Sequence, residues 1–196
     1  MKLGFGCDHT GFEMKAALME YLSEKGHECV DCNTSEEAGG KVDYPNPGRR
    51  VAEAVAAGTV EKGVLVCGTG IGISLAANKV PGIRAAVCSE PVSAGLATRH
   101  NNANIISMGA RIVGLETAKA IVDAFLDNTF EGGRHAQRVD MIMQIERLWE
   151  AGRTKDLIRH LRLCRCELMD ILHESQKRVD RVDTLIRQTE KTMETK

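Results

Sequence analysis

Short, continuous apolar runs alternate along this chain with longer segments in which apolar residues recur every third or fourth position. The runs are typical of buried strands, and the periodic segments are typical of helices. We predict strands at 2–7, 28–32, 63–67, 84–88 and 104–108, and helices at 12–25, 47–57, 73–79, 91–99 and 115–126. Because strands and helices alternate, the pattern predicts a Rossmann-like α/β fold. It would have three layers, with a five-stranded parallel sheet between helices on both faces.

The pattern changes beyond the last of these helices. A helix is predicted at 134–149, a break follows at 151–152, and the segment 156–193 is charged, helix-forming sequence without proline or glycine. Its apolar residues recur at alternating steps of four and three, as in a coiled coil or helical hairpin; they are Leu161, Leu168, Leu172, Val179, Val182, Ile186 and Met193. Three polar residues interrupt this stripe, namely Arg165, Ser175 and Thr189. We expect a main domain at 1–150 and a helical extension at 151–196 that serves interaction or oligomerisation.

Composition narrows the class of protein. A chain of 196 residues with 43% hydrophobic content can bury one core and carry a small appendage. The formal net charge of −1 provides no overall field to attract nucleic acid or an anionic membrane. No apolar stretch is long enough to cross a bilayer, and the first residues lack a signal-peptide pattern, so we expect a cytoplasmic protein.

The seven cysteines are odd in number and scattered, so we expect most of them to be reduced, small and buried. Cys29 and Cys32 have the spacing of half a zinc site or of a redox pair, and Cys164 with Cys166 could complete a zinc site. The first pair, however, falls in a predicted strand, whereas a redox pair is expected at a helix N-terminus. We expect no bound metal and retain zinc as the alternative.

A glycine-rich turn, Gly68–Gly72, follows Cys67 at the end of a predicted strand and precedes a helix. Its backbone N–H groups can point into one concavity, where the helix dipole also favours an anion. The glycine spacing fits neither a dinucleotide fingerprint nor a nucleoside-triphosphate loop. Taken alone, the motif fits a structural turn with a core cysteine as well as it fits an anion-binding site. Because carboxyl ends of parallel strands share one edge, Asp8 and His9, which follow the first strand, should lie beside this turn.

Two further clusters carry cations and amides, RHNN at 99–102 and RHAQR at 134–138. Arg134 and Arg138 lie four residues apart, on one face of the predicted helix and at its start. Positive charge opposes the helix dipole there, so the pair favours a bound anion between the two guanidinium groups. Phosphate is the natural anion, and a solvated charged face is the alternative.

Five stretches of the chain together resemble the ribose-5-phosphate isomerase B family, within a wider family that includes the galactose-6-phosphate isomerase subunits. They are FGCDHTGF, DYPNPGRRVAEAV, VCGTGIGISLAANKVPGIRAAVCSEP, RHNNANIISMGAR and FEGGRHAQRV. They occur in order, from the start of the chain to about Trp149. His100 and the GGRH segment favour the ribose-phosphate branch, and the extension beyond Gly152 lies outside the resemblance.

The resemblance implies interconversion of ribose 5-phosphate and ribulose 5-phosphate through a cis-enediol, a step of the non-oxidative pentose phosphate pathway, without metal or organic cofactor. It implies that Cys67 is the base, which removes the proton from C2 and returns it at C1. The helix N-terminus beyond the glycines favours the thiolate that this role requires. The hydroxyl of Thr69 and the turn can hold the enediolate oxygen; the turn residues concerned are Gly68, Gly70, Ile71 and Gly72.

The resemblance also assigns the remaining roles. His100 delivers a proton to the ring oxygen when the cyclic sugar opens, and Asp8 assists from the hydroxyl side. His9, Arg134 and Arg138 bind the phosphate. Further contacts to the substrate are expected from Asn101, Arg111 and Tyr44.

The predicted topology also bears on assembly. His100 and Asn101 lie between a helix and the strand that follows it, at the amino edge of the sheet and opposite Cys67. We therefore expect them to serve a neighbouring subunit in a homodimer or higher homo-oligomer, with no nucleic-acid or membrane partner. The substrate alternatives are allose 6-phosphate and galactose 6-phosphate. The alternatives from other classes are a non-catalytic sugar-phosphate sensor and a nucleotide-binding protein.

Overall fold

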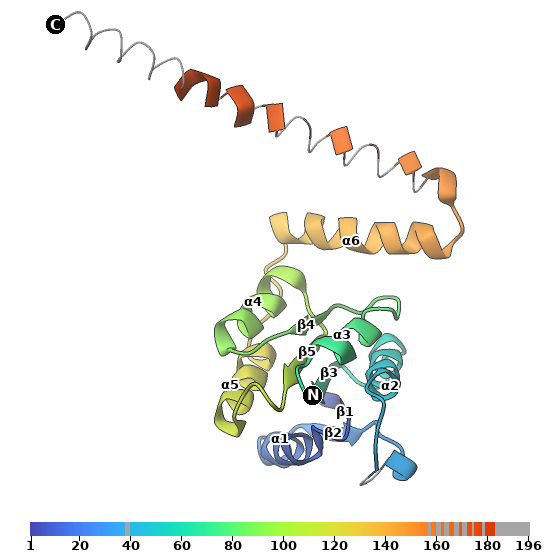
Figure 1. The fold of residues 1–196 in the computed structure, drawn as a ribbon, viewed down its shortest axis with the longest axis vertical. Helices are drawn as coiled ribbons and strands as arrows, with labels where there is room; N and C mark the ends of the chain where they lie inside the picture. Colours follow the sequence, from blue (N-terminus) through green and yellow to red (C-terminus); the bar gives the residue numbers. More distant parts are fainter. Residues whose placement is uncertain are drawn as a thin grey trace, which may run out of the picture. The chain divides into compact units, whose positions relative to one another are not determined.

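The computed structural model describes the chain over residues 1–37, 40–156, 158–159, 162, 165–166, 169, 172–173, 175–177 and 179–182. Its contacts divide the chain into two compact units, Met1–Met143 and Gln144–Lys196. The first unit contains the sheet and the helices that cover it (Figure 1).

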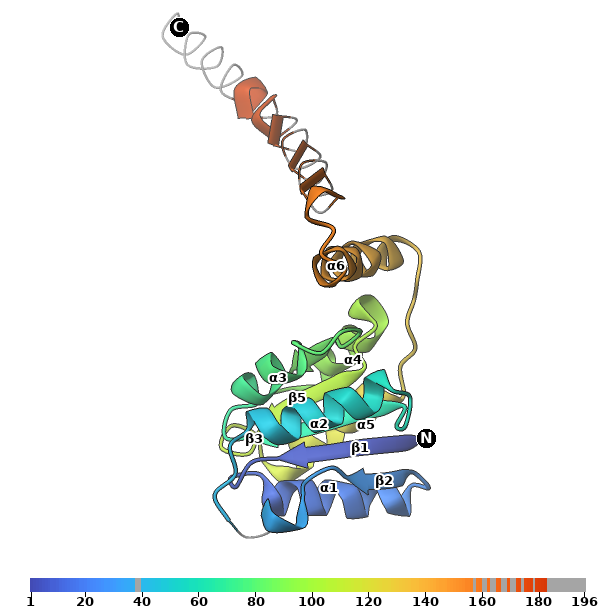
Figure 2. The ribbon, with the colours of Figure 1, turned by 90° about the vertical axis from the view of Figure 1, so that its right-hand side faces the viewer.

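Five strands and six α-helices are present in the described part of the chain. The strands are β1 (Lys2–Cys7), β2 (Glu28–Asp31), β3 (Lys62–Cys67), β4 (Ala85–Val87) and β5 (Ile105–Gly109). The helices are α1 (Phe12–Glu24), α2 (Pro45–Ala56), α3 (Ile71–Ala77), α4 (Pro91–Asn101), α5 (Leu115–Leu126) and α6 (Arg134–Glu150). The strands form one sheet in the order β2-β1-β3-β5-β4, and every neighbouring pair is parallel (Figure 2). The predicted α/β fold is confirmed.

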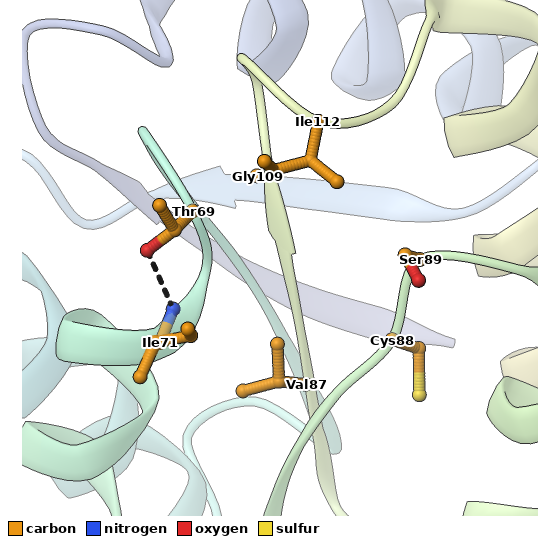
Figure 3. Close-up of a pocket in the computed structure, with 7 residues that line it drawn as sticks. All are labelled: Thr69, Ile71, Val87, Cys88, Ser89, Gly109 and Ile112. Carbon is orange, nitrogen blue, oxygen red and sulfur yellow. Dashed lines mark hydrogen bonds between the residues drawn. The ribbon is translucent and has the colours of Figure 1, made fainter.

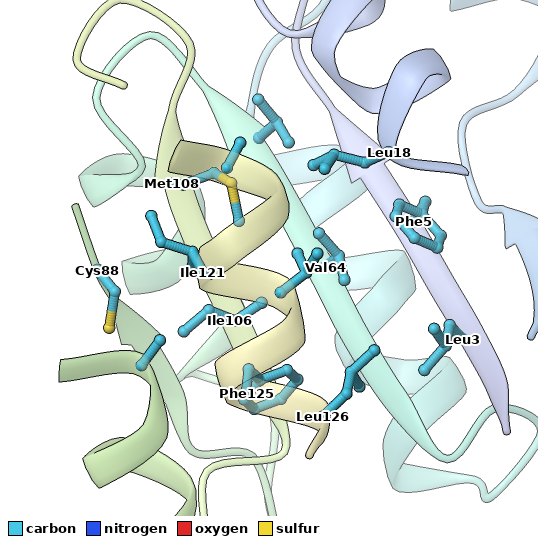
Figure 4. Close-up of a cluster of buried hydrophobic side chains, with 14 of the residues drawn as sticks. Leu3, Phe5, Leu18, Val64, Cys88, Ile106, Met108, Ile121, Phe125 and Leu126 are labelled. Atoms are coloured by element: carbon cyan, nitrogen blue, oxygen red, sulfur yellow. The ribbon is translucent and has the colours of Figure 1, made fainter. Parts of the chain in front are cut away.

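Successive residues of β3 point to opposite faces of the sheet, which places a separate core on each face. Val64 and Val66 pack in the cluster that α1, α4 and α5 complete, and Figure 4 shows α5 lying over this face. Leu65 and Cys67 belong to the other cluster, with residues of α2 and α3. Cys67 therefore lies on the face that α2 and α3 cover.

Two helices begin two residues earlier than the apolar pattern predicted. α2 starts at Pro45, where the fixed φ of proline suits the first turn of a helix. α3 starts at Ile71, so Gly72 lies inside the helix rather than before it. The cause is local: Gly70 closes the turn with a φ of +78°, and the Ile71 N–H already donates to Thr69 Oγ1 at 3.3 Å.

In the second unit, α6 ends at Glu150 and a turn follows at 151–152, where a break was predicted. Beyond it, the described residues from Thr154 onward are helical. Leu172, Val179 and Val182 of the predicted stripe are exposed. The other residues of the stripe lie outside the described residues, namely Leu161, Leu168, Ile186 and Met193. No helix among the described residues is long and apolar enough to span a membrane.

Candidate active site

A backbone N–H group points at the sulfur of Cys67. Cys67 is the last residue of β3, and only 4% of its surface is exposed. The chain then turns through three residues, so that Gly70 N lies 3.1 Å from Cys67 Sγ and donates to it. A donor aimed at a sulfur stabilises negative charge that develops there.

The turn after Cys67 is held against β5. A methyl group at Gly70 would lie 2.8 Å from the backbone carbon of Met108, so only glycine allows this approach. Ser107 is completely buried in β5, and its hydroxyl donates to Gly70 O at 2.7 Å. On the other side of the turn, Arg111 N donates to Gly68 O at 3.1 Å. Arg111 therefore belongs to the same corner of the molecule as Cys67.

The loop after β1 lies beside this turn, as the sequence predicted. Asp8 N donates to Val66 O at 3.1 Å, next to Cys67 in β3. The buried Asp8 carboxylate accepts hydrogen bonds through Oδ1 from Thr10 N at 2.9 Å and from Thr10 Oγ1 at 2.6 Å, which fixes the loop. His9 Nδ1 lies 3.2 Å from Val42 O.

Tyr44, which directly precedes α2, also lies beside these residues. A methyl group at Gly72 would lie 2.7 Å from Tyr44 Cε2, so the phenol ring rests directly on the glycine. Tyr44 as a whole is still 43% exposed, and it can contact a bound molecule. One edge of the sheet thus combines the predicted residues Asp8, His9, Tyr44, Cys67, Gly68, Thr69, Gly70, Ile71, Gly72 and Arg111.

A cavity of about 260 Å³ opens beside Thr69. Its lining is mostly apolar (Figure 3) and consists of Thr69, Ile71, Val87, Cys88, Ser89, Gly109 and Ile112. Burial, with Glu90 nearby, raises the pKa of the Cys88 thiol to about 11, so this cysteine stays protonated at neutral pH. Cys67 is not among the lining residues, and the cavity shares only the turn with it.

A second group of side chains forms where the end of α4 meets the start of α6. The rings of His100 and His135 stack with their centroids 4.2 Å apart and their planes 1° apart. Glu131 Oε2 lies 3.6 Å from His100 Nε2 and 3.8 Å from His135 Nε2. Arg99 Nε donates to Glu131 Oε1 at 2.6 Å, and Arg134 Nε donates to His135 Nε2 at 3.4 Å.

The charges of this second group shift two pKa values. A hydrogen bond from Arg99 lowers the pKa of the Glu131 carboxyl, so this group is ionised. Desolvation lowers the pKa of His135, and the positive potential of His100 and Arg134 lowers it further. The lowered pKa favours the neutral form of His135, and the cluster combines a carboxylate with cationic guanidinium groups.

The two groups occupy opposite edges of the sheet. Cys67 pairs with Gly109 at the carboxyl end of β5, whereas His100 and Asn101 precede Ile105 at its amino end. Since a strand rises about 3.3 Å per residue, β5 alone separates the edges by roughly 13 Å. Within one chain, His100 therefore does not reach Cys67, and Arg134 lies beside His100 rather than beside His9.

Comparison with known proteins identifies the relatives of this architecture. The Ribose/Galactose Isomerase family matches residues 3–142. The chain belongs to this family. Ribose-5-phosphate isomerase B of Escherichia coli is 53% identical over 145 residues, which are 74% of this chain and 96% of that protein.

Solved structures of the isomerase family share the fold. Ribose-5-phosphate isomerase B of Clostridium thermocellum superposes with a TM-score of 0.73 at 48% identity, covering 76% of this chain and 99% of that chain. The Mycoplasma genitalium enzyme with bound ribulose-5-phosphate superposes with a TM-score of 0.70 at 37% identity, covering 74% and 96%. The family match ends near the boundary of the first unit, so the helical extension lies outside it.

Sequence reasoning missed several residues of this isomerase architecture. Ser107 was counted only as part of a buried strand, although a hydroxyl inside an apolar run was a usable signal. Glu131 and His135 were given no role, because their neighbour His100 is distant in the sequence. The expected absence of a metal stays a prediction. The zinc alternative involved Cys164, which lies outside the described residues.

Proposed function

We propose that the chain interconverts ribose 5-phosphate and ribulose 5-phosphate by cofactor-independent proton transfer, a step of the non-oxidative pentose phosphate pathway. The observation that carries the proposal is the hydrogen bond from Gly70 N–H to Cys67 Sγ at the end of β3. It supports a thiolate base at the edge of the sheet where ligands bind in open α/β folds. The 53% identity to an enzyme with this name supports the substrate.

In the open-chain sugar, the Cys67 thiolate removes the proton from C2. The electron pair of that bond forms the C1–C2 double bond, and the C1 carbonyl oxygen becomes the enediolate oxygen. The Thr69 hydroxyl and the N–H groups of the turn stabilise this charge as it develops. The O1 oxygen gains a proton while the O2 hydroxyl loses one, and the Cys67 thiol returns its proton to C1, which yields the ketose.

Cyclic ribose 5-phosphate must open before this step. In the proposal, His100 donates a proton to the ring oxygen, and Asp8 accepts the proton of the anomeric hydroxyl. The phosphate lies between His9 of one chain and the guanidinium groups of Arg134 and Arg138 of a neighbouring chain. Asn101 and Arg111 form hydrogen bonds with the substrate, and the ring of Tyr44 packs against the sugar.

We further propose that the enzyme is a homodimer, or a higher homo-oligomer, whose sites are shared between subunits. One chain supplies Cys67 and Asp8, and its neighbour supplies His100, because the two edges of one sheet are too far apart for both groups to reach one sugar. Exposed apolar side chains around the cavity support the proposal that a second copy of the chain packs over them. Ile71, Val87 and Ile112 are 55%, 44% and 59% exposed.

Subunit mixing tests the shared site. We expect Cys67→Ala and His100→Ala chains to be inactive alone, whereas a mixture refolded together regains up to about a quarter of the wild-type activity. In mixed dimers, one site then keeps both intact residues. A mixture that stays inactive, or an active monomer by light scattering, would contradict the proposal.

Proton exchange at C2 of ribose 5-phosphate in deuterated water, with chelator present, tests the base. The wild-type chain should exchange and isomerise, and Cys67→Ala should do neither. Exchange by the variant would place the base elsewhere, and binding without turnover by the wild-type chain would indicate a sensor. Parallel assays with allose 6-phosphate and galactose 6-phosphate define the substrate range.

The proposed location is the cytoplasm. The free thiols of the described chain support it, because reduced cysteines are typical of that compartment. They are Cys7, Cys29, Cys32, Cys67, Cys88 and Cys166.

A further inference from the structure

Three side chains with metal-binding atoms converge where α4 ends. His100 Nε2 and His135 Nε2 lie 3.6 Å and 3.8 Å from Glu131 Oε2, and the three residues each offer one ligand atom within 4.8 Å of the other two. Across the described residues, no other group of three histidine, cysteine or acidic side chains converges in this way. Two imidazoles and one carboxylate are a donor set that zinc sites use, with a fourth position left open.

The spacing of these atoms fits a small divalent ion. With metal–ligand distances of about 2.1 Å in tetrahedral geometry, neighbouring ligand atoms lie about 3.4 Å apart. The observed distances from Glu131 Oε2 to the two histidine nitrogens exceed this value by about 0.2 and 0.4 Å. Because a metal lies in the plane of each imidazole that binds it, and the two rings are parallel, one ring must also turn about its Cβ–Cγ bond so that both nitrogens face one ion.

The Glu131 carboxylate is already held where it faces both histidines. Arg99 holds Glu131 through Oε1, which leaves Oε2 directed at the histidines, and the stack of the two rings opens when one ring turns toward the metal. Arg134 Nε donates to His135 Nε2, so this nitrogen presents its lone pair outward from the ring. A metal that displaces this weak 3.4 Å hydrogen bond gains a free imidazole ligand.

The surroundings select the type of metal. Imidazole ligands favour Zn²⁺, Co²⁺, Ni²⁺ and Cu²⁺, whereas Mg²⁺ and Ca²⁺ prefer oxygen ligands. The positive charges of Arg99, Arg134 and Arg138 weaken the binding of any cation that is held by charge alone. We propose that His100, Glu131 and His135 form a site for a zinc-type divalent metal, and that a metal bound there inhibits the isomerase by occupying His100.

The two halves of this proposal have different foundations. Binding rests on the geometry of the three side chains. Inhibition rests on the proposed function, in which His100 Nε2 must be free to deliver a proton to the sugar ring. A metal on that nitrogen removes the lone pair that carries the proton. Occupancy of the site is therefore expected to block ring opening.

Cobalt absorption tests the binding half on the whole chain. Cys67→Ser serves as the background, because it removes the thiol of the candidate site as a competing ligand. In that background we expect one Co²⁺ per chain in near-tetrahedral coordination, and at least about tenfold weaker binding after His135→Ala or Glu131→Gln, since even changes around a ligand cost that much. His173→Ala and Glu116→Gln change the same residue types outside the cluster and serve as controls.

Isomerase assays test the inhibitory half. Zn²⁺ should inhibit the wild-type chain, chelator should restore the activity, and Mg²⁺ should have no effect. His135→Ala or Glu131→Gln should raise the Zn²⁺ concentration for half-inhibition by at least about tenfold.

The possible results separate the two halves. Equal cobalt binding by His135→Ala and by the controls overturns the site. If cobalt binds at the cluster and the wild-type chain isomerises equally well with and without Zn²⁺, the inhibition is overturned and the site is supported. If cobalt binds at the cluster but the wild-type chain does not isomerise even with chelator, the site is supported and the proposed function is overturned instead.

Discussion

One buried hydroxyl, that of Ser107, holds the turn that carries Cys67. It donates to Gly70 O, and the N–H of the same glycine donates to Cys67 Sγ. We expect Ser107→Ala to lower the free energy of unfolding by about 1 kcal/mol. We expect a larger effect on catalysis, with kcat lowered about tenfold and KM little changed, because the donor to the sulfur shifts. Urea unfolding and steady-state kinetics measure the two effects.

Ser74→Ala is the matched control for that prediction. Ser74 is also buried, but its hydroxyl donates to Ile71 O within α3 and leaves the contact between Ser107 and Gly70 intact. Equal losses of kcat in the two variants would show that a missing buried hydroxyl, rather than the position of the turn, matters.

The same residues show what sequence can reveal at this scale. The arrangement of Cys67 and its glycines follows from neighbouring residues, because a strand, a turn and a helix succeed one another within a few positions. The contact of Ser107 with Gly70 joins residues 37 positions apart, so no local pattern encodes it. His135 was visible as part of a basic cluster, but its stacking on His100 depends on how two helices meet.

At the scale of elements, the segment after β2 braces the end of β1 that leads to Asp8. The Asn33 side chain accepts from Cys7 N at 3.0 Å and donates to Cys7 O at 2.8 Å, as a neighbouring strand would. It also donates to Glu37 at 3.0 Å, and Glu37 pairs with Arg50 of α2. One carboxylate thus connects the loop, the strand and the helix.

This carboxylate predicts a pH dependence of stability. Burial alone would raise the pKa of Glu37, but hydrogen bonds from Arg50, Thr34 N–H and Asn33 lower it below its usual value. Because the pKa of Glu37 is lower in the folded chain, its carboxylate stabilises the fold at pH values above its pKa in the unfolded chain, about 4.3. This stabilisation is lost as the pH falls through the pKa of Glu37 in the folded chain. Glu37→Gln should therefore cost about 1 kcal/mol at pH 7 and nothing in strong acid.

Urea unfolding at several pH values checks this, with Glu116→Gln as the control. The Glu116 side chain is 86% exposed, and its ion pair within the described residues is with Lys119 on the same helix, so its removal should have little effect. An equal pH dependence in Glu37→Gln and the wild-type chain would contradict the role of Glu37.

The elements themselves were largely predictable. The strands and helices of the sheet follow from apolar runs and helical periodicity, and their ends differ from the predicted ends by at most two residues. The shifts occur where a backbone feature overrides the apolar pattern, as Pro45 does in α2 and Gly70 does before α3. The bracing by Asn33 was not predictable, because its partners come from different elements.

At the scale of the whole molecule, topology decides how the candidate site is distributed. Parallel strands place Cys67 at one edge and His100 at the other, and this division could be derived from the order of the elements. The cluster around Glu131 could not, since it combines the end of α4 with the residues before α6. The structure leaves the extension as a separate unit, and its function has to be tested by removal.

Deletion of residues 153–196 is the direct test of the predicted division into domains. Both hydrophobic cores lie in the first unit, and the matched region covers 96% of the Escherichia coli relative, so the shortened chain should fold and keep most of its turnover. Four apolar residues of the described extension are exposed, namely Ile158, Leu172, Val179 and Val182. Their burial against another copy of the chain would stabilise an oligomer.

Sedimentation should therefore show a lower state of association for the shortened chain than for the 196-residue chain. Val179→Asp in the 196-residue chain should cause the same decrease, because it places a charge on the apolar stripe without removing any residue. A shortened chain that does not fold would contradict the division into domains. Equal association of all three chains, with turnover unchanged, would leave the isomerase unit intact and exclude the stripe as a contact between copies.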